Sequence, residues 1–164
     1  MSAPAGTRPP RESTISPCFS PRACSLAVHI ARREAGLAFD LAKVDLATHR
    51  LADGSDYLAI NPRGYVPVLE TDAGERHTEV AALLMKIAAL ARAQHLLPAA
   101  GSPEHGRTIE WLVFVATELH KTFSPWLWHK ETASSTRDSA KQKLAARFVD
   151  MDKHLEQRQW LAGD

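Results

Sequence analysis

Apolar positions near the start of the chain mark one amphipathic helix. Within residues 25–36, Leu26, Ile30 and Ala31 recur at the spacing of successive helical turns. Gly36 follows them, and glycine readily adopts the left-handed backbone that ends a helix. The pattern therefore predicts a helix over this range, with these three apolar side chains on one face.

Shorter runs on either side of this helix predict strands. Residues 15–19 form a weak strand candidate, in which Pro17 favours an edge strand or the start of a strand because it donates no hydrogen bond. Residues 38–46 alternate in part between apolar and polar and predict a second strand. The polar residues 47–54 indicate a loop, and residues 56–60 predict a short helical turn.

Turn residues organise the next segment. Residues 66–69 predict a strand with a proline at its start, and residues 72–74 predict a hairpin turn that leads into a returning strand at 75–78. A run of alanines and leucines over 79–91 predicts a helix. The order β-α-β, then β-β-α, predicts a small mixed sheet with a helix on each face.

The second half of the chain has helical periodicity only. Residues 95–103 predict a linker by their prolines and small residues. Helices are expected over 104–120 and 136–159, and Ser124-Pro125 is expected to break the first. The apolar positions in register are Ile109, Leu112, Val113 and Ala116 on the first helix, and Leu144, Phe148, Met151 and Leu155 on the second.

Composition argues against two classes of partner. The chain has 20 basic and 19 acidic residues, so nothing predicts the basic surface that a nucleic acid requires. No run approaches the roughly 20 apolar residues of a membrane span. Residues 1–14 lack the apolar core of a secretory signal, and we expect a disordered leader and a cytoplasmic protein.

The cysteines and histidines predict neither a metal site nor a disulfide. Cys18 and Cys24 are not spaced as C-x-x-C, and the eight histidines form no metal-ligand motif. Cys18 falls within a predicted strand, where packing is the simplest role. We therefore expect no metal and no structural disulfide.

Cys24 lies directly before the predicted helix at 25–36. Free N–H groups and the positive end of the helix dipole stabilise a thiolate there, so we expect its pKa below the usual value of about 8.5. A buried packing cysteine is the alternative, and position alone does not separate the two. Ser25 is a candidate hydrogen-bond donor to the sulfur, or an ordinary helix cap.

Three further places carry candidate binding groups. Val66-Pro67 opens a strand, where a cis proline leaves the preceding backbone able to pair with an extended peptide; a plain strand-edge proline fits as well. Glu79 begins a helix and suits either the helix dipole or the amino group of a ligand. His120 and Lys121 are expected at a helix C-terminus, where the dipole alone favours cations.

Three long segments share the pattern of one known family. Ser20-Pro-Arg-Ala-Cys-Ser-Leu-Ala-Val-His-Ile30 is similar to S-P-G-A-C-S-L-x-x-H-I, and Asp56-Tyr-Leu-Ala-Ile-Asn-Pro-Arg-Gly-Tyr-Val-Pro-Val-Leu69 is similar to D-Y-L-x-I-N-P-K-G-Q-V-P-x-L. The third is Ile109-Glu-Trp-Leu, followed by Glu118-Leu-His-Lys-Thr-Phe-Ser-Pro125. Over residues 16–164 the chain thereby resembles the glutathione transferase superfamily, close to its bacterial beta class.

The resemblance implies an α/β plus all-α fold and a glutathione site. It implies a thioredoxin-like domain at 15–94 and a partial helical domain at 104–164, as a homodimer. Glutathione is the implied co-substrate, with a small hydrophobic electrophile as its partner. Cys24 would face the glutathione sulfur, with Ser25 and His120 as supporting donors. The implied glutathione-binding residues are His49, Tyr65, Val66, Pro67, Glu79, Val80, Glu118 and Lys121.

By the same resemblance, several of these residues have distinct roles. Val66 pairs with the glutathione backbone, and Glu79 holds the γ-glutamyl end. His120 and Lys121 close the cleft from the helical domain, and Glu118 faces glutathione across the dimer.

Several positions depart from the family pattern. Val80 replaces a serine or glycine, His49 a lysine, and Val113 an asparagine. Arg22 replaces a glycine, and the chain stops at Asp164, ahead of the family's last helices, so we expect a truncated helical domain. Two alternatives therefore stay open: a catalytically weak or silent scaffold with this fold, and a redox thiol protein independent of glutathione.

Overall fold

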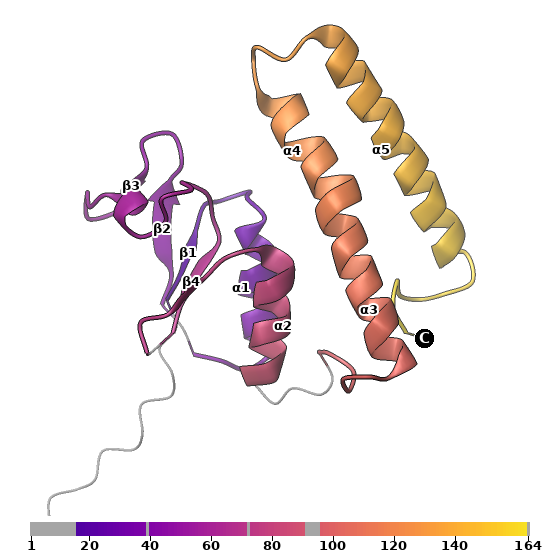
Figure 1. Ribbon diagram of the computed structural model, residues 1–164, viewed down its shortest axis with the longest axis horizontal. Coiled ribbons are helices and arrows are strands. Elements are labelled where there is room, and N and C mark those ends of the chain that lie inside the picture. Colours follow the sequence, from indigo (N-terminus) through magenta and orange to yellow (C-terminus); the bar gives the residue numbers. More distant parts are fainter. Residues whose placement is uncertain (1–15, 39, 72, 91–95, 164) are drawn as a thin grey trace, which may run out of the picture. The chain divides into compact units, whose positions relative to one another are not determined.

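The computed structural model consists of two compact units, Met1–Leu96 and Leu97–Asp164 (Figure 1). It describes residues 16–38, 40–71, 73–90 and 96–163. The leader expected at 1–14, and the first residue of the strand expected at 15–19, lie outside the described residues.

Five short strands form a mixed sheet in the first unit. They are β1 (Ser16–Phe19), β2 (Ala42–Asp45), β3 (Arg50–Leu51), β4 (Val68–Glu70) and β5 (Arg76–His77). Their order across the sheet is β3-β2-β1-β4-β5. β1 runs parallel to β2, and the other neighbouring pairs are antiparallel.

The proline in β1 lies at the start of a central strand. Pro17 pairs with Leu69 of β4, and the pairing with β2 begins one residue later, at Cys18 opposite Ala42. The edge-strand alternative is therefore wrong, and the strand-start alternative is confirmed. The missing N–H of Pro17 falls before the parallel ladder begins, so that ladder loses no hydrogen bond.

The second strand is shorter than the 38–46 that the sequence predicts, and a further strand follows it. β3 lies inside the segment 47–54 that the sequence predicts as a loop, with Leu51 opposite Val44. A two-residue strand carries too little alternation for a sequence pattern to detect.

Two helices, α1 (Ser25–Glu34) and α2 (Val80–Leu90), lie side by side on one face of the sheet (Figure 1). The prediction of a helix on each face is therefore wrong. Val28, Leu69, Leu83 and Ile87 form one buried cluster that both helices share with β4. The hydrophobic pattern of a helix does not record the face of the sheet on which the helix packs.

The face that α1 buries differs from the expected one. Leu26 and Ile30 are 56% and 53% exposed, whereas Val28 and Arg32 are buried. Val28 and Arg32 lie one helical turn apart and so face the sheet together. The helix ends as predicted, because Gly36 has a φ of 66° and the amide after it donates to the Arg32 carbonyl at 3.1 Å.

A second buried cluster occupies the opposite face of the sheet. Val68 precedes Leu69 in β4, so their side chains point to opposite faces. The helical turn expected at 56–60 is confirmed as η1 (Tyr57–Ala59), with the Asp56 carboxylate capping the Leu58 N–H at 3.0 Å. The cluster consists of Cys18, Val44, Tyr57, Val66 and Val68.

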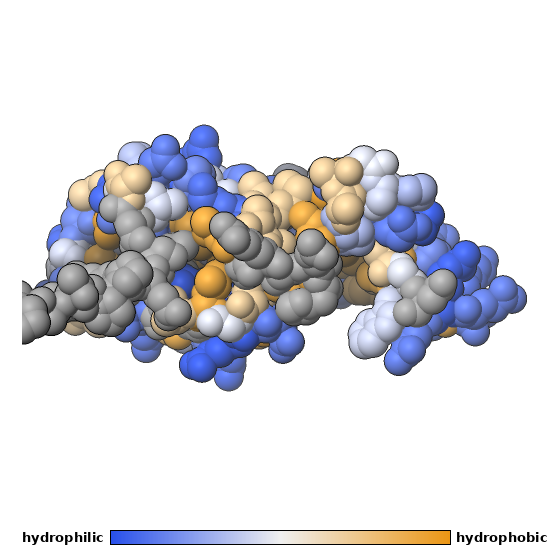
Figure 2. All heavy atoms as spheres, turned by 90° about the horizontal axis from the view of Figure 1, so that it is seen from below, coloured by the Kyte–Doolittle hydropathy of each residue, from blue (hydrophilic) through white to orange (hydrophobic). Residues whose placement is uncertain are grey.

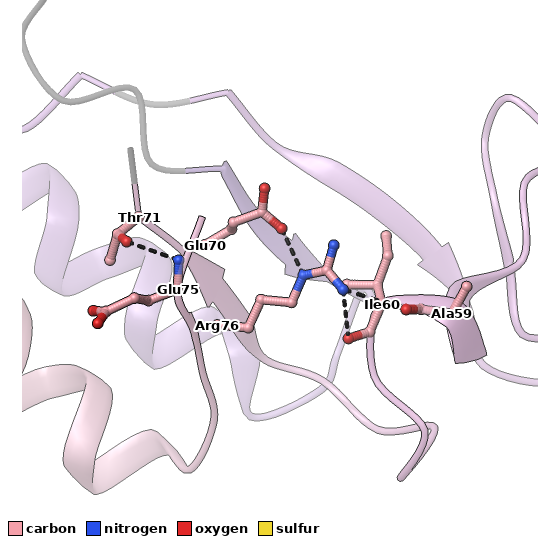
Figure 3. Close-up of polar contacts among 6 residues, drawn as sticks. All are labelled: Ala59, Ile60, Glu70, Thr71, Glu75 and Arg76. Carbon is pink, nitrogen blue, oxygen red and sulfur yellow. Dashed lines mark hydrogen bonds and ion pairs between the residues drawn. The ribbon is translucent and has the colours of Figure 1, made fainter. Parts of the chain in front are cut away.

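Arg76 ties β5 to the end of η1 (Figure 3). Its Nε donates to a Glu70 carboxylate oxygen at 2.7 Å, and its Nη1 donates to the carbonyls of Ala59 and Ile60, each at 3.3 Å. In the turn between β4 and β5, the Glu75 N–H donates to the Thr71 hydroxyl at 3.2 Å. These contacts hold the segment after η1 against the outer strand.

The second unit begins with a long continuous helical segment. The hydroxyl of Ser102 accepts from the His105 N–H at 3.1 Å, and a proline follows the cap, which is a favoured helix start. The segment comprises α3 (Pro103–Phe114), the π-helical η2 (Val115–His120) and α4 (Lys121–Trp128), and α5 (Ser134–Leu155) follows.

The expected helix break at Ser124-Pro125 is wrong, because α4 continues to Trp128. A proline inside a helix removes one backbone hydrogen bond. Packing of α4 on α5 compensates: Thr122 is buried on the first helix, and Ala140 and Leu144 are buried on the second. His120 and Lys121 therefore lie within a helical rod, and the explanation of their charge by a helix C-terminus does not apply.

Much apolar surface of both units reaches the exterior. On α5, Leu144 is buried as expected, but Phe148 is 54% exposed, and Leu155 is also exposed. Val113 of α3 is exposed as well. Figure 2 shows apolar residues at the surface between polar ones. No helix among the described residues is long and apolar enough to cross a membrane.

Candidate functional site

Cys24 is the N-cap residue of α1, as the sequence predicts. The loop before it closes through the Ala23 N–H, which donates to the Ser20 carbonyl at 3.2 Å. Arg22 within this loop has a φ of 65°, a left-handed conformation that favours glycine. The loop places Cys24 at the N-terminus of α1, which is the positive end of the helix dipole.

The hydroxyl of Ser25 has a different role from those expected. It donates to the Ser20 carbonyl at 3.2 Å and accepts from the Ser20 N–H at 3.3 Å, and the residue is buried. A hydroxyl carries one proton, so in this arrangement Ser25 does not donate to the Cys24 sulfur. It is also not the helix cap; it fastens the loop that positions Cys24.

The sulfur of Cys24 lies beside the start of β4. Its thiol contacts the Val66 carbonyl with a sulfur–oxygen distance of 3.4 Å. The Val66-Pro67 bond is cis, which is one of the two alternatives that the sequence leaves open. Among the described residues, none accepts a hydrogen bond from the Val66 N–H. The structure thus brings a thiol and a backbone donor close together.

Tyr57 and Asn61 hold the backbone of Tyr65, the residue directly before Val66. Both donate to the Tyr65 carbonyl, the Tyr57 hydroxyl at 2.8 Å and the Asn61 amide at 2.7 Å. Burial raises the pKa of Tyr57 to about 12. The sequence pattern predicts no role for either residue, although both lie in the Asp56–Leu69 motif.

Glu79 stands directly before α2 with a φ of 68°. Its carboxylate accepts from the Tyr65 hydroxyl at 2.7 Å. Arg63 Nη1 lies 3.2 Å from the same Tyr65 hydroxyl and 3.3 Å from the Thr78 hydroxyl. These four residues form an exposed network, called here the Glu79 network.

Val80 and His49 occupy less open positions. The Val80 side chain packs against the cluster of Val28 and Leu83, so its bulk is directed into the core. His49 has a φ of 52°, and its ring lies so close to Gly64 that a Cβ there would be 2.8 Å from the ring carbon Cε1. Its Nδ1 is buried without a hydrogen-bond partner among the described residues.

Glu118, His120 and Lys121 belong to the second unit. Glu118 accepts from Arg147 at 2.8 Å and lies 3.3 Å from Lys143, and these contacts hold the pKa of its carboxyl below the usual range. His120 is exposed, and Lys121 lines a hollow of about 370 Å³ between α4 and α5. The Glu118 carboxylate is therefore already neutralised within its own unit.

The described residues contain no group of three or more histidine, cysteine, aspartate or glutamate side chains placed to hold a metal ion.

The two cysteines are expected to differ in reactivity. Burial, followed by the charge of Glu70, raises the pKa of Cys18, whose side chain is enclosed, whereas Cys24 is partly exposed. Iodoacetamide at neutral pH should therefore alkylate Cys24 first and Cys18 only after urea is added. Peptide mapping by mass spectrometry measures this, and equal labelling of both in the native chain would contradict it.

Replacing Arg22 with glycine is expected to stabilise the fold. The substitution removes the left-handed strain of a non-glycine residue, and we expect the free energy of unfolding to rise by about 1 kcal/mol. Urea denaturation measures the change. Arg33→Gly, in the last turn of α1, is the control and should lower stability by about 1 kcal/mol; a loss in both variants would contradict the strain argument.

Comparison with known proteins identifies the family. The family model for the glutathione S-transferase N-terminal domain matches residues 21–90. Glutathione S-transferase GstA of Escherichia coli O157:H7 is 39% identical over 145 residues, which cover 88% of this chain and 72% of that protein. The chain belongs to the glutathione S-transferase family.

Solved glutathione S-transferases have the same fold. One is the beta-class enzyme of Sphingomonas chungbukensis, with 40% identity and a TM-score of 0.84 over 90% of this chain and 73% of its own. Another, from a sphingomonad, was solved in complex with glutathione; it has 40% identity and a TM-score of 0.85 over 91% of this chain and 74% of its own. The expected fold, a thioredoxin-like part followed by a helical part, is therefore confirmed.

Proposed function

We propose that this chain is a glutathione transferase that binds reduced glutathione in its first unit, with the glutathione sulfur facing Cys24. The observation that carries the proposal is the meeting of the Cys24 thiol with the backbone of Val66 at the start of α1. A helix start stabilises a thiolate, and a free backbone N–H beside it can pair with an extended peptide. The glutathione-bound relative of 40% identity supports the same ligand.

The site is suited to two reactions of sulfur. In the first, the glutathione thiolate attacks an electrophilic carbon, forms a carbon–sulfur bond and expels a leaving group such as halide. In the second, the Cys24 thiolate attacks a glutathione disulfide, forms a mixed disulfide and releases one glutathione thiolate. Both reactions need a thiolate near neutral pH, and the position of Cys24 at the start of α1 favours a thiolate there.

Each binding residue of the first unit has a proposed role within residues 15–94. Val66 pairs with the glutathione backbone next to Pro67, and Tyr65 sets the geometry of that strand through its carbonyl. Glu79 binds the ammonium group of the γ-glutamyl end, and Val80 offers its backbone N–H. His49 contributes through its packing on Gly64, since its Nδ1 is enclosed.

The second unit supplies the proposed remainder of the site. His120 and Lys121, in the helical domain at 104–164, contact the bound co-substrates, and Glu118 faces glutathione in a homodimer only if it leaves Arg147. The second substrate is a small hydrophobic electrophile. We propose a cytoplasmic protein that uses no metal and binds neither nucleic acid nor membrane.

The proposal is tested by incubating the chain with glutathione and a halonitrobenzene and following the conjugate by absorbance. In parallel, glutathione disulfide is added and the intact mass is measured. We expect conjugation and one mixed disulfide, at Cys24. Absence of both products would overturn the proposal.

A silent glutathione transferase-like scaffold is the second candidate, favoured by the neutralised Glu118 and by Val80, which lacks a hydroxyl. Calorimetric titration with glutathione distinguishes this scaffold from a glutathione transferase, because a scaffold of this kind gives no binding signal. A glutathione-independent redox thiol would instead react at Cys24 equally fast with and without glutathione.

A further inference from the structure

The Glu79 network places a cation beside the proposed ammonium-binding carboxylate. The Tyr65 hydroxyl bridges the two charges: it donates to Glu79 at 2.7 Å and accepts from Arg63 at 3.2 Å. The Thr78 hydroxyl accepts from the same Arg63 nitrogen at 3.3 Å. Arg63 and Glu79 are therefore held close together without a direct ion pair between them.

Most of the Arg63 guanidinium remains available to a ligand. Only Nη1 is engaged, and no described residue accepts a hydrogen bond from its Nε or Nη2. Arg63 and Thr78 also line a hollow of about 400 Å³, together with Asn61 and Arg76. A guanidinium with free donors at the rim of a hollow matches the planar geometry of a carboxylate.

We propose that Arg63 binds the free α-carboxylate of the γ-glutamyl end of glutathione while Glu79 binds the adjacent ammonium group. This inference rests on the proposed function and names a residue that selects the ligand. An ammonium and a carboxylate on one carbon are a few ångströms apart, which fits two opposite charges bridged by one phenol oxygen. Tyr65 and Thr78 are positioning residues, because they act through Arg63 and Glu79.

The sequence explains why a cation is needed at this end of the site. Val80 has no hydroxyl to donate to a ligand, and its side chain packs into the core. The backbone N–H of Val80 alone leaves a ligand carboxylate with a neutral donor. Arg63 supplies a charge-assisted donor from a different loop, and such hydrogen bonds are stronger than neutral ones.

Calorimetry on the full chain tests this with three ligands and three variants. The ligands are glutathione, γ-aminobutyryl-cysteinyl-glycine, which lacks only the α-carboxylate, and glutathione esterified at its glycine carboxylate. The variants are Arg63→Met, Arg63→Lys, which retains the charge without the planar guanidinium, and, as a matched control, Arg33→Met at the exposed end of α1. Arg63 is on the surface, and circular dichroism checks that all three variants fold.

We expect Arg63→Met to weaken binding of glutathione and of its glycine ester about tenfold, and Arg63→Lys by less. Binding of the ligand without the α-carboxylate should be unchanged by Arg63→Met, and Arg33→Met should change none of the three. Equal weakening of all three ligands by Arg63→Met, or no weakening of any, overturns the inference and leaves the proposed function intact. If the unaltered chain binds no glutathione, the proposed function fails as well.

Discussion

Replacing Cys24 with serine is expected to abolish formation of the mixed disulfide with glutathione. A serine hydroxyl stays protonated at neutral pH and forms no disulfide, so the covalent product is lost outright. Intact-mass measurement after incubation with glutathione disulfide reads this directly. The Cys24 thiol contacts the Val66 carbonyl at 3.4 Å, and a hydroxyl of similar size makes a similar contact, so the variant should fold.

Cys18→Ser is the matched control for this experiment. Cys18 is buried in the sheet, and burial raises its pKa, so its loss should leave the mixed disulfide unchanged. Its cost is confined to stability, because a hydroxyl replaces an apolar thiol in the core. A mixed disulfide that persists in Cys24→Ser and disappears in Cys18→Ser would contradict the assignment of the reactive cysteine.

The sequence predicts well the parts of the fold that local chemistry determines. The helix end at Gly36 and the turn around Tyr57 each follow from one or two residues with strong local preferences. The cis bond at Val66-Pro67 does not follow from that dipeptide, because an X-Pro bond prefers the trans form. Tertiary packing determines the rest. The face of the sheet that α2 covers, and the continuation of α4 through Pro125, depend on contacts between distant segments that no local pattern records.

The candidate site also contains some features that local sequence predicts and others that depend on tertiary packing. Cys24 at the helix start is visible in the sequence, because a residue before an amphipathic stretch is a helix cap. The hydrogen bonds that occupy Ser25 and Glu118 are not, because their partners are selected by folding. Tyr57 and Asn61 both donate to the Tyr65 carbonyl. The motif contains both residues, but their order in the sequence does not show that they share this acceptor.

Replacing Tyr57 with alanine is expected to lower the free energy of unfolding by about 3–5 kcal/mol, the range for truncating a fully buried aromatic side chain. Tyr57 is completely enclosed among Val44, Val66 and other apolar residues. Urea denaturation followed by circular dichroism measures the loss. Leu58→Ala is the control: its side chain is exposed, and its effect should stay within roughly 0.5 kcal/mol. Similar losses in the two variants would contradict a packing role for Tyr57.

Replacing Tyr57 with phenylalanine separates the contribution of the hydroxyl from that of the ring, and its effect on stability is expected to disappear at high pH. Near pH 8 the variant should be less stable by about 1 kcal/mol, because the Tyr65 carbonyl keeps only Asn61 as donor. Burial raises the pKa of Tyr57 to about 12, whereas an unfolded tyrosine titrates near pH 10. Between these values the unfolded chain releases a proton that the folded chain retains, so stability from this group falls as pH rises. By pH 11 the unaltered chain should have lost about 1 kcal/mol that the variant does not lose, and the two should be equally stable. Urea denaturation of both at pH 8 and 11 tests this, and an unchanged difference would show that Tyr57 titrates normally.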